Sequence, residues 1–212
     1  ATRVFYNGIN SNLTLRRLTL TGGNGAGAIS SGYGGAVLNS SGTLTVDRCT
    51  LAGNSAEKGG ALFSSTSGVT GQLSSTTLLN QCTLFDNTAV INGGAVYNNN
   101  GQTTMLHCTV SCNSAPTGAG AGVSSFGDNL TRTAARYCII AGNGASDVDF
   151  YGAASNSFLS QGSNLIGRGN ATGSFVVSGD SINHTSATIK LPPPGSYGGP
   201  SWTMALLPGS PA

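Results

Sequence analysis

Apolar residues recur along this chain at fixed distances from a set of cysteines. Cys49, Cys82, Cys108 and Cys138 are each followed two positions later by a large aliphatic residue, and another apolar residue stands three positions before each. The position directly after the cysteine is threonine or isoleucine, and we expect it to face outward. Apolar and polar positions thus alternate with a period of two, which predicts short β-strands with one buried face.

The same marker residues return at the same phase in successive repeats. The cysteines are spaced by 33, 26 and 30 residues, and a Gly-Gly-Ala marker such as Gly59-Gly-Ala lies between them. Glycine in every repeat and abundant Thr and Val disfavour helices. An antiparallel meander does not explain identical phases, whereas coils stacked about 4.8 Å apart do. We therefore predict an all-β fold, a right-handed parallel β-helix of about five to six coils.

The repeats also suggest how the chain is organised. Residues 1–145 are expected to form the β-helix, and residues 146–212 an irregular C-terminal coil or cap of the same domain. The chain begins in mid-pattern at Ala1 and stops abruptly at Ala212, so we expect both ends to be cuts within a longer precursor.

Composition narrows the classes of partner. Only 8% of the residues are charged and the net charge is +2, whereas about a quarter of residues are charged in ordinary domains. No basic stripe is visible in the sequence, so nucleic acid is not expected as a partner. No apolar run approaches the roughly 20 residues of a membrane-spanning helix.

The cysteine column predicts a buried ladder of reduced thiols that act as small apolar groups. Disulfides between neighbouring coils are an alternative, because stacked strands lie within the permitted Cα distance. Zinc is a weaker alternative, since no Cys-x-x-Cys pair occurs. Cys112 lies outside the column and is expected to be the most accessible thiol.

An asparagine follows each column cysteine by five positions, at Asn54, Asn87, Asn113 and Asn143. Asparagine tolerates left-handed turns, and its amide can bond the next coil. We expect a structural ladder; contact with a ligand is the alternative.

The residue just before each cysteine forms a polar and aromatic column that includes Arg17, Arg48, His107 and Tyr137. Such a strip suits an extended polysaccharide, and a solvated edge of the solenoid is the plainer interpretation. Asp147 and Asp149 are the only closely spaced carboxylates, and they are candidates for a metal or acid–base site. The plainer interpretation of this pair is a solvated corner, and no cofactor is expected.

Several motifs resemble those of a known group of proteins. The line Gly34-Gly-Ala-Val, with Gly42-Thr-Leu-Thr-Val and Cys49-Thr-Leu-Ala-Gly-Asn-Ser-Ala, looks like the repeats of bacterial β-helix surface proteins, including chlamydial polymorphic outer-membrane proteins. The segments Gly162-Ser-Asn-Leu-Ile-Gly and Tyr197-Gly-Gly-Pro-Ser-Trp to Ala212 resemble the closing part of choice-of-anchor β-helix proteins. The Ile-Asp-Ala-Gly that usually follows is missing here.

The resemblance implies a secreted or cell-surface β-helix. The expected function is a non-catalytic, adhesin-like structural module whose surface contacts polysaccharide or other surface proteins. The alternative is a polysaccharide-active enzyme similar to pectate lyases, which would need a carboxylate cluster beside a basic residue.

Overall fold

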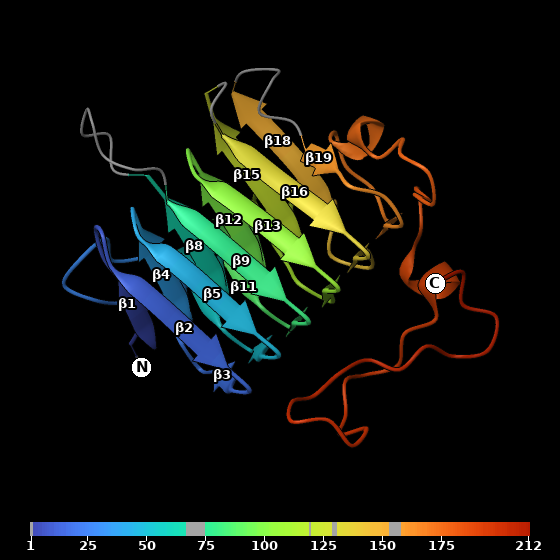
Figure 1. The fold of residues 1–212 in the computed structure, drawn as a ribbon, viewed down its shortest axis with the longest axis horizontal. Helices are drawn as coiled ribbons and strands as arrows, with labels where there is room; N and C mark the ends of the chain where they lie inside the picture. The colour runs from blue at the N-terminus through green and yellow to red at the C-terminus, as the bar shows by residue number, and fades with distance from the viewer. Residues whose placement is uncertain (1, 67–74, 119, 129–130, 153–157) are drawn as a thin grey trace.

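The computed structural model describes residues 2–66, 75–118, 120–128, 131–152 and 158–212. Its strands are stacked in parallel, and the chain makes about five turns of a β-solenoid as it passes through six levels, which we call coils 1 to 6. Each coil supplies one strand to each of three six-stranded sheets (Figure 1). The prediction of a parallel β-helix is therefore confirmed.

The three sheets follow one another around each coil. The first sheet contains β1 (Phe5–Asn7), β4 (Val37–Ser40), β8 (Leu62–Ser65), β12 (Val96–Asn99), β15 (Val123–Gly127) and β18 (Val148–Gly152). The second contains β2 (Asn12–Arg16), β5 (Thr43–Asp47), β9 (Thr76–Asn80), β13 (Gln102–Leu106), β16 (Arg132–Arg136) and β19 (Phe158–Ser160). The third contains β3 (Thr19–Thr21), β6 (Thr50–Ala52), β10 (Thr83–Phe85), β14 (Thr109–Ser111), β17 (Ile139–Ile140) and β20 (Leu165–Ile166).

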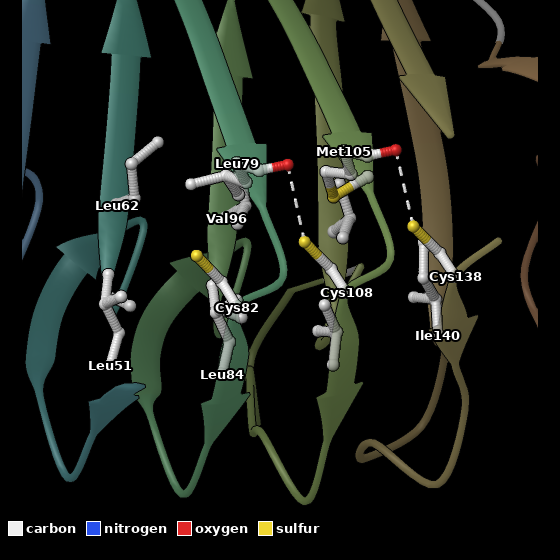
Figure 2. Packing of buried hydrophobic residues seen from close by; sticks show 14 of the residues in the cluster. Leu51, Leu62, Leu79, Cys82, Leu84, Val96, Met105, Cys108, Cys138 and Ile140 are labelled. Atoms are coloured by element: carbon white, nitrogen blue, oxygen red, sulfur yellow. Dashed lines mark hydrogen bonds between the residues drawn. The ribbon is translucent and has the colours of Figure 1, made fainter. Parts of the chain in front are cut away.

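Residues at the same phase of the repeat pair directly across neighbouring coils. In the third sheet Leu51 is opposite Leu84 and Leu84 is opposite Val110. These columns of aliphatic side chains fill the interior, and the column cysteines lie among them (Figure 2). The inward phase inferred from the period-two pattern is confirmed, because like side chains stack on like throughout the core.

The bends between the second and third sheets and at the end of the third sheet are left-handed. Each coil turns from the second to the third sheet at the residue before the column cysteine, with φ between 51° and 54° in coils 1 to 5. A second left-handed residue precedes each ladder asparagine, such as Gly53 with φ 60° and Asp86 with φ 54°. The inward apolar residue stands three positions before the inward cysteine, which departs from the period of two, and this first bend accounts for the extra residue.

Regular pairing continues past residue 145. Strands β18, β19 and β20 pair in register with β15, β16 and β17, so coil 6 extends to Ile166. Coil 6 has Asn164 at the position of the column cysteine, so the cysteine pattern does not mark it, although the predicted number of five to six coils includes it. A two-stranded sheet of β7 (Ser55–Lys58) and β11 (Thr88–Asn92), the short helix η2 (Thr172–Ser174) and α1 (Ser186–Ile189) complete the elements.

The C-terminal segment returns along the outside of the third sheet (Figure 1). The Thr50 hydroxyl donates to the carbonyl oxygen of Trp202 (2.9 Å), and the Trp202 and Phe85 rings lie 6.5 Å apart. Thr50 and Thr83 are consequently buried. The column after the cysteine faces outward from the solenoid as expected, but at these two coils a non-repeating segment covers that outer face.

In the part of the chain that the structure describes, no helix has the length and apolar character needed to cross a membrane.

Candidate functional site

The column of Arg17, Arg48, Gln81, His107 and Tyr137 lies along the bend between the second and third sheets. Their backbone amides donate to the carbonyl oxygens of the next coil, as Arg48 does to Asn80 (2.9 Å). All five residues have left-handed backbones. Because the backbone geometry repeats, the five side chains leave the solenoid at the same phase, and we call this column the bend strip.

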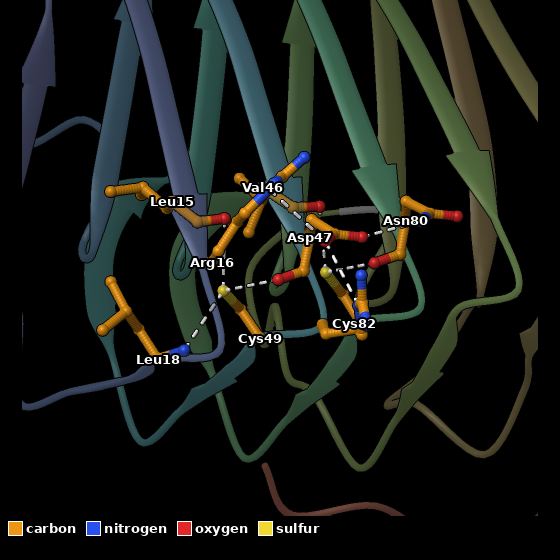
Figure 3. A network of polar contacts seen from close by, with 9 residues as sticks. Leu15, Arg16, Leu18, Val46, Asp47, Cys49, Asn80 and Cys82 are labelled. Atoms are coloured by element: carbon orange, nitrogen blue, oxygen red, sulfur yellow. Dashed lines mark hydrogen bonds and ion pairs between the residues drawn. The ribbon is translucent and has the colours of Figure 1, made fainter. Parts of the chain in front are cut away.

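A buried carboxylate organises the first two coils of the bend strip (Figure 3). Asp47 Oδ2 lies 3.6 Å from Arg16 Nε and 3.2 Å from Arg48 Nε, while Asn80 Nδ2 donates to Asp47 Oδ1 (2.8 Å). The hydrogen bond from Asn80 lowers the pKa of Asp47, and the guanidinium groups of Arg48 and Arg16 lower it further against the effect of burial. The carboxylate stays ionised and holds two guanidinium groups whose outer parts face solvent.

Aromatic stacking organises the far end of the bend strip. The ring centroids of His107 and Tyr137 are 4.9 Å apart with an interplanar angle of 22°. The guanidinium carbon of Arg136 lies 4.7 Å from the centroid of the Tyr137 ring, and Arg136 also donates to the Tyr137 hydroxyl (3.0 Å). These contacts orient the His107 and Tyr137 side chains relative to each other.

The asparagine column forms a continuous hydrogen-bonded ladder. The Asn87 side-chain amide donates to Asn113 Oδ1 (2.9 Å), to the Leu51 carbonyl oxygen (2.9 Å) and to the Phe85 carbonyl oxygen (3.0 Å). Its own Oδ1 accepts from the backbone and side-chain amides of Asn54. Asn54, Asn87, Asn113 and Asn143 all follow this pattern, and all four are buried.

Asp147 ends the asparagine ladder. Its Oδ1 accepts from the backbone and side-chain amides of Asn143 (2.8 Å each), and its Oδ2 accepts from the Arg168 amide (2.7 Å). Beyond Asp147 the described part of the ladder has no further asparagine that could accept a hydrogen bond, and both side-chain oxygens of Asp147 face N–H donors. A carboxylate therefore fits this position, whereas an amide would place its own N–H group against another N–H group. Burial raises the pKa of Asp147, and the hydrogen bonds from Arg168 and Asn143 oppose that shift.

Asp149 and Asp180 also accept hydrogen bonds at the C-terminal end of the solenoid, but from residues outside the asparagine ladder. Asp149 accepts from the Gly120 amide (2.6 Å), the Asn170 amide (2.7 Å) and the Ser146 hydroxyl. Asp180 Oδ1 accepts from both amides of Asn164 (3.0 Å each). Asn164 itself occupies the cysteine column, because the strands that follow Cys138 and Asn164 are paired.

Asp147 and Asp149 are not at a solvated corner, since their exposed fractions are only 3% and 4%. That expectation was wrong because the chain returns over them after residue 166. Their oxygens bind separate sets of N–H and O–H donors, an arrangement that satisfies each carboxylate within the protein. Among the described residues, no group of three or more His, Cys, Asp and Glu side chains is placed to hold a metal ion.

All five cysteines are free, the four column thiols are buried and Cys112 is exposed. Cys82 donates to the Val46 carbonyl oxygen of the previous coil and to the Asn80 carbonyl oxygen of its own coil, both at 3.3 Å. Cys108 and Cys138 repeat the pattern. Burial raises the pKa of the Cys49 and Cys108 thiols, so these groups are protonated and poorly nucleophilic.

A groove of about 470 Å³ borders the second sheet on the side opposite the bend strip. It spans coils 1 to 4 and is lined by Asn10, Asn12, Ser41, Gly42, Thr43, Thr76 and Gln102. The described residues of its lining offer hydroxyl and amide groups and include no titratable side chain. No sequence motif marks this groove, since its residues are brought together only by the stacking of coils 1 to 4.

Comparison of the chain with protein-family models, with curated proteins and with solved structures gives no match.

Proposed function

We propose that this chain is a non-catalytic β-helix module of a secreted or cell-surface protein, adhesin-like, which binds glycans along the second sheet. The bend strip carries the proposal. Five coils in succession place a large polar or aromatic side chain on a left-handed backbone, where glycine or asparagine would be easier to accommodate. Residues held in sparsely populated backbone regions point to a function for their side chains.

The open second sheet supports this assignment. Its strands face the viewer in Figure 1, and no other described element is drawn across them. Outward positions such as Thr43, Thr76 and Gln102 are exposed and in register. Rows of hydroxyl and amide groups repeated about every 4.8 Å suit an extended chain of sugars, whose hydroxyl groups need many donors and acceptors.

The resemblance to choice-of-anchor β-helix proteins supports placement at the cell surface. It rests on the motifs at Gly162–Gly167 and Tyr197–Ala212, and membership of that group is part of the proposal.

A polysaccharide lyase is the competing assignment, and the hydrogen bonds of the carboxylates argue against it. A lyase needs ionised oxygens free to bind calcium and a base to remove a proton. The oxygens of Asp147 and Asp149 already accept N–H groups. Incubation with pectin or alginate in calcium should release no unsaturated products; turnover that is lost in Asp147→Ala/Asp149→Ala would establish the enzyme instead.

The proposal is tested on a glycan array with and without calcium. We expect the chain to retain a defined subset of glycans in both conditions. The variant His107→Ala/Tyr137→Ala should lose signal, whereas Tyr197→Ala, which removes an exposed tyrosine of the C-terminal segment, should not. Equal binding by both variants would contradict a role for the bend strip, and an array with no signal would contradict glycan binding.

A further inference from the structure

We propose that the outer face of the second sheet and the bend strip together bind an anionic polysaccharide, one that carries carboxylate or sulfate groups along an extended chain. This rests on the proposed function and names its class of ligand. The observation behind it is a segregation of charge that the linear sequence hides.

Five of the nine basic residues of the chain lie on this surface: Arg16, Arg17, Arg48, Arg132 and Arg136. The described strands of the second sheet and the bend strip contain one carboxylate, Asp47, which is already engaged by Arg16 and Arg48. The surface therefore carries four net positive charges, whereas the whole chain carries two. No basic stripe is visible in the linear sequence, but folding brings these arginines, which come from positions as far apart as 16 and 136, to one surface.

The arginines form two groups at opposite ends of the surface. One group belongs to coils 1 and 2, and the other to coil 5, which lies three to four steps of about 4.8 Å away, or about 14 to 19 Å along the solenoid axis. Arg132 and Arg136 stand four residues apart on β16, which separates them by about 13 Å across the sheet. A ligand that contacts both groups must be extended and must carry repeated negative charges.

Exposure leaves the guanidinium groups available to a ligand. The Arg16 and Arg48 side chains are 68% and 44% exposed although each is oriented by Asp47. A guanidinium group offers five N–H donors in a planar fork and matches a carboxylate or sulfate oxygen pair. Between the two arginine groups lie Asn80, Gln81 and Gln102, which suit the hydroxyl groups of the sugars.

An anionic polysaccharide fits this surface better than a single-stranded nucleic acid. Nonspecific binding of single strands relies on aromatic faces on which bases stack. His107 and Tyr137 each use one ring face to stack on the other, and Arg136 also contacts the Tyr137 ring, so part of the aromatic surface is already in use. The remaining contacts are charged groups and hydrogen-bond donors, which match an acidic sugar chain.

The test compares a charged polysaccharide with its neutral ester and with a single-stranded nucleic acid. Binding of the full chain to polygalacturonate, to its fully methyl-esterified form and to poly(dT) is measured by calorimetry or interferometry at several salt concentrations. We expect binding to polygalacturonate that weakens with salt, and at least about tenfold weaker binding to the esterified polymer. Tighter binding to poly(dT) than to polygalacturonate would overturn the polysaccharide assignment.

A matched pair of variants locates the site. Arg17→Gln/Arg136→Gln removes two charges without disturbing the contacts of Asp47, and Gln81 shows that glutamine is accepted at the Arg17 position of the bend. Lys58→Gln/Lys190→Gln removes the same charge away from this surface. We expect the arginine variant to weaken binding about tenfold and to reduce its salt dependence, and the lysine variant to change neither.

The outcomes separate this inference from the proposed function. Equal binding to the charged and esterified polymers would leave glycan binding intact and contradict the anionic class. Equal losses in the arginine and lysine variants would contradict the site. If the chain binds no polysaccharide, either on the array or by calorimetry or interferometry, the proposed function is contradicted as well.

Discussion

Two stacks of buried polar side chains run along this solenoid, and they differ in how completely they are satisfied. The asparagine ladder from Asn54 to Asn143 is uninterrupted and ends on Asp147. The second stack lies inside the corner between the first and second sheets, where β1, β4, β8, β12 and β15 bring together Asn7, Asn39, Ser64, Asn98 and Ser125. Asn98 Oδ1 and Thr103 Oγ1 there have no hydrogen-bond partner among the described residues.

The lengths of the corners explain the difference. Every column cysteine is followed by its asparagine after five residues, so each coil presents the same ladder geometry. At the other corner two residues connect β4 to β5 and β12 to β13, whereas residues 66–75 separate β8 from β9. Asn39 reaches across its short corner to the Gly42 carbonyl oxygen (3.1 Å), and Ser64 instead bonds Ser75 (2.7 Å).

The size of the residues at these corners also differs between the short corners and the long one. A Cβ added to Gly42 would lie 2.5 Å from Asn7 Nδ2, and one added to Gly101 would lie 2.7 Å from Asn98 Oδ1. Glycine therefore accompanies asparagine at short corners. Ser64 is too short to replace the donor that Asn7 supplies to Asn39 (2.8 Å), and the stack is broken there. Uniform coils support an unbroken ladder, whereas corners of varied length support hydrogen bonds between some coils and interrupt the stack at others.

The largest predicted difference is in thiol reactivity. The four column cysteines should react far more slowly than Cys112, because the cysteine column lies in the uniform part of the coils. We expect Cys49, Cys82, Cys108 and Cys138 to react with a thiol reagent at least about a thousandfold more slowly than Cys112, which corresponds to about 4 kcal/mol of opening free energy. Mass spectrometry after timed labelling of the native protein reads each site. Comparable rates at all five sites would show that the stack opens readily.

Asn87→Ala should be the most destabilising change in the ladders. It removes the side-chain hydrogen bonds to the Leu51 and Phe85 carbonyl oxygens and the side-chain acceptor of the Asn54 amide, so we expect a loss of about 3 kcal/mol in the free energy of unfolding by urea. The exposed Asn12→Ala is the control and should cost under about 0.5 kcal/mol. An unchanged unfolding midpoint for Asn87→Ala would remove the ladder's structural role.

Asp147→Asn tests how the ladder ends. The new amide would direct an N–H group toward the amide of Arg168 or of Asn143, while the loss of a buried charge offsets part of that cost. We expect a loss of about 2 kcal/mol in the free energy of unfolding. A more stable variant would mean that burying the carboxylate costs more than its hydrogen bonds return.

Asn98→Ala should lower the free energy of unfolding least of these variants. It compares the second stack directly with the asparagine ladder. Asn98 donates to Gly101, Arg132 and Thr133, but its Oδ1 has no partner among the described residues. The variant therefore removes one buried unsatisfied oxygen, and we expect a loss of only about 1 kcal/mol. A loss equal to that of Asn87→Ala would erase the distinction between the two stacks.

The fold was predictable from the sequence because its determinants are periodic. Like residues at like phase fixed the parallel stacking, the inward cysteines and the bend before each of them. The second stack was only partly visible, since Ser64 and Ser125 replace asparagine where the corner changes length. A repeat-based analysis detects what recurs and misses a column whose members change with a loop.

The non-repeating features could not be read from periodicity. Trp202 covers Thr50 across 152 residues of sequence, and no local pattern signals that contact. The roles of Asp147, Asp149 and Asp180 likewise depend on the path of the chain after Ile166. The arginine surface combines residues of coils 1, 2 and 5, so it emerges only when the register of the second sheet is known.

Native-state hydrogen exchange at the ladder gives the most direct test of the account. The backbone amides of Asn54, Asn87, Asn113 and Asn143 donate to a side-chain oxygen rather than to a backbone carbonyl, with distances of 2.8 to 3.1 Å. We predict that these four turn amides exchange as slowly as the amides of the neighbouring third-sheet strands. Exchange at the rate of exposed turns would contradict the central claim that stacked side chains hold the coils together.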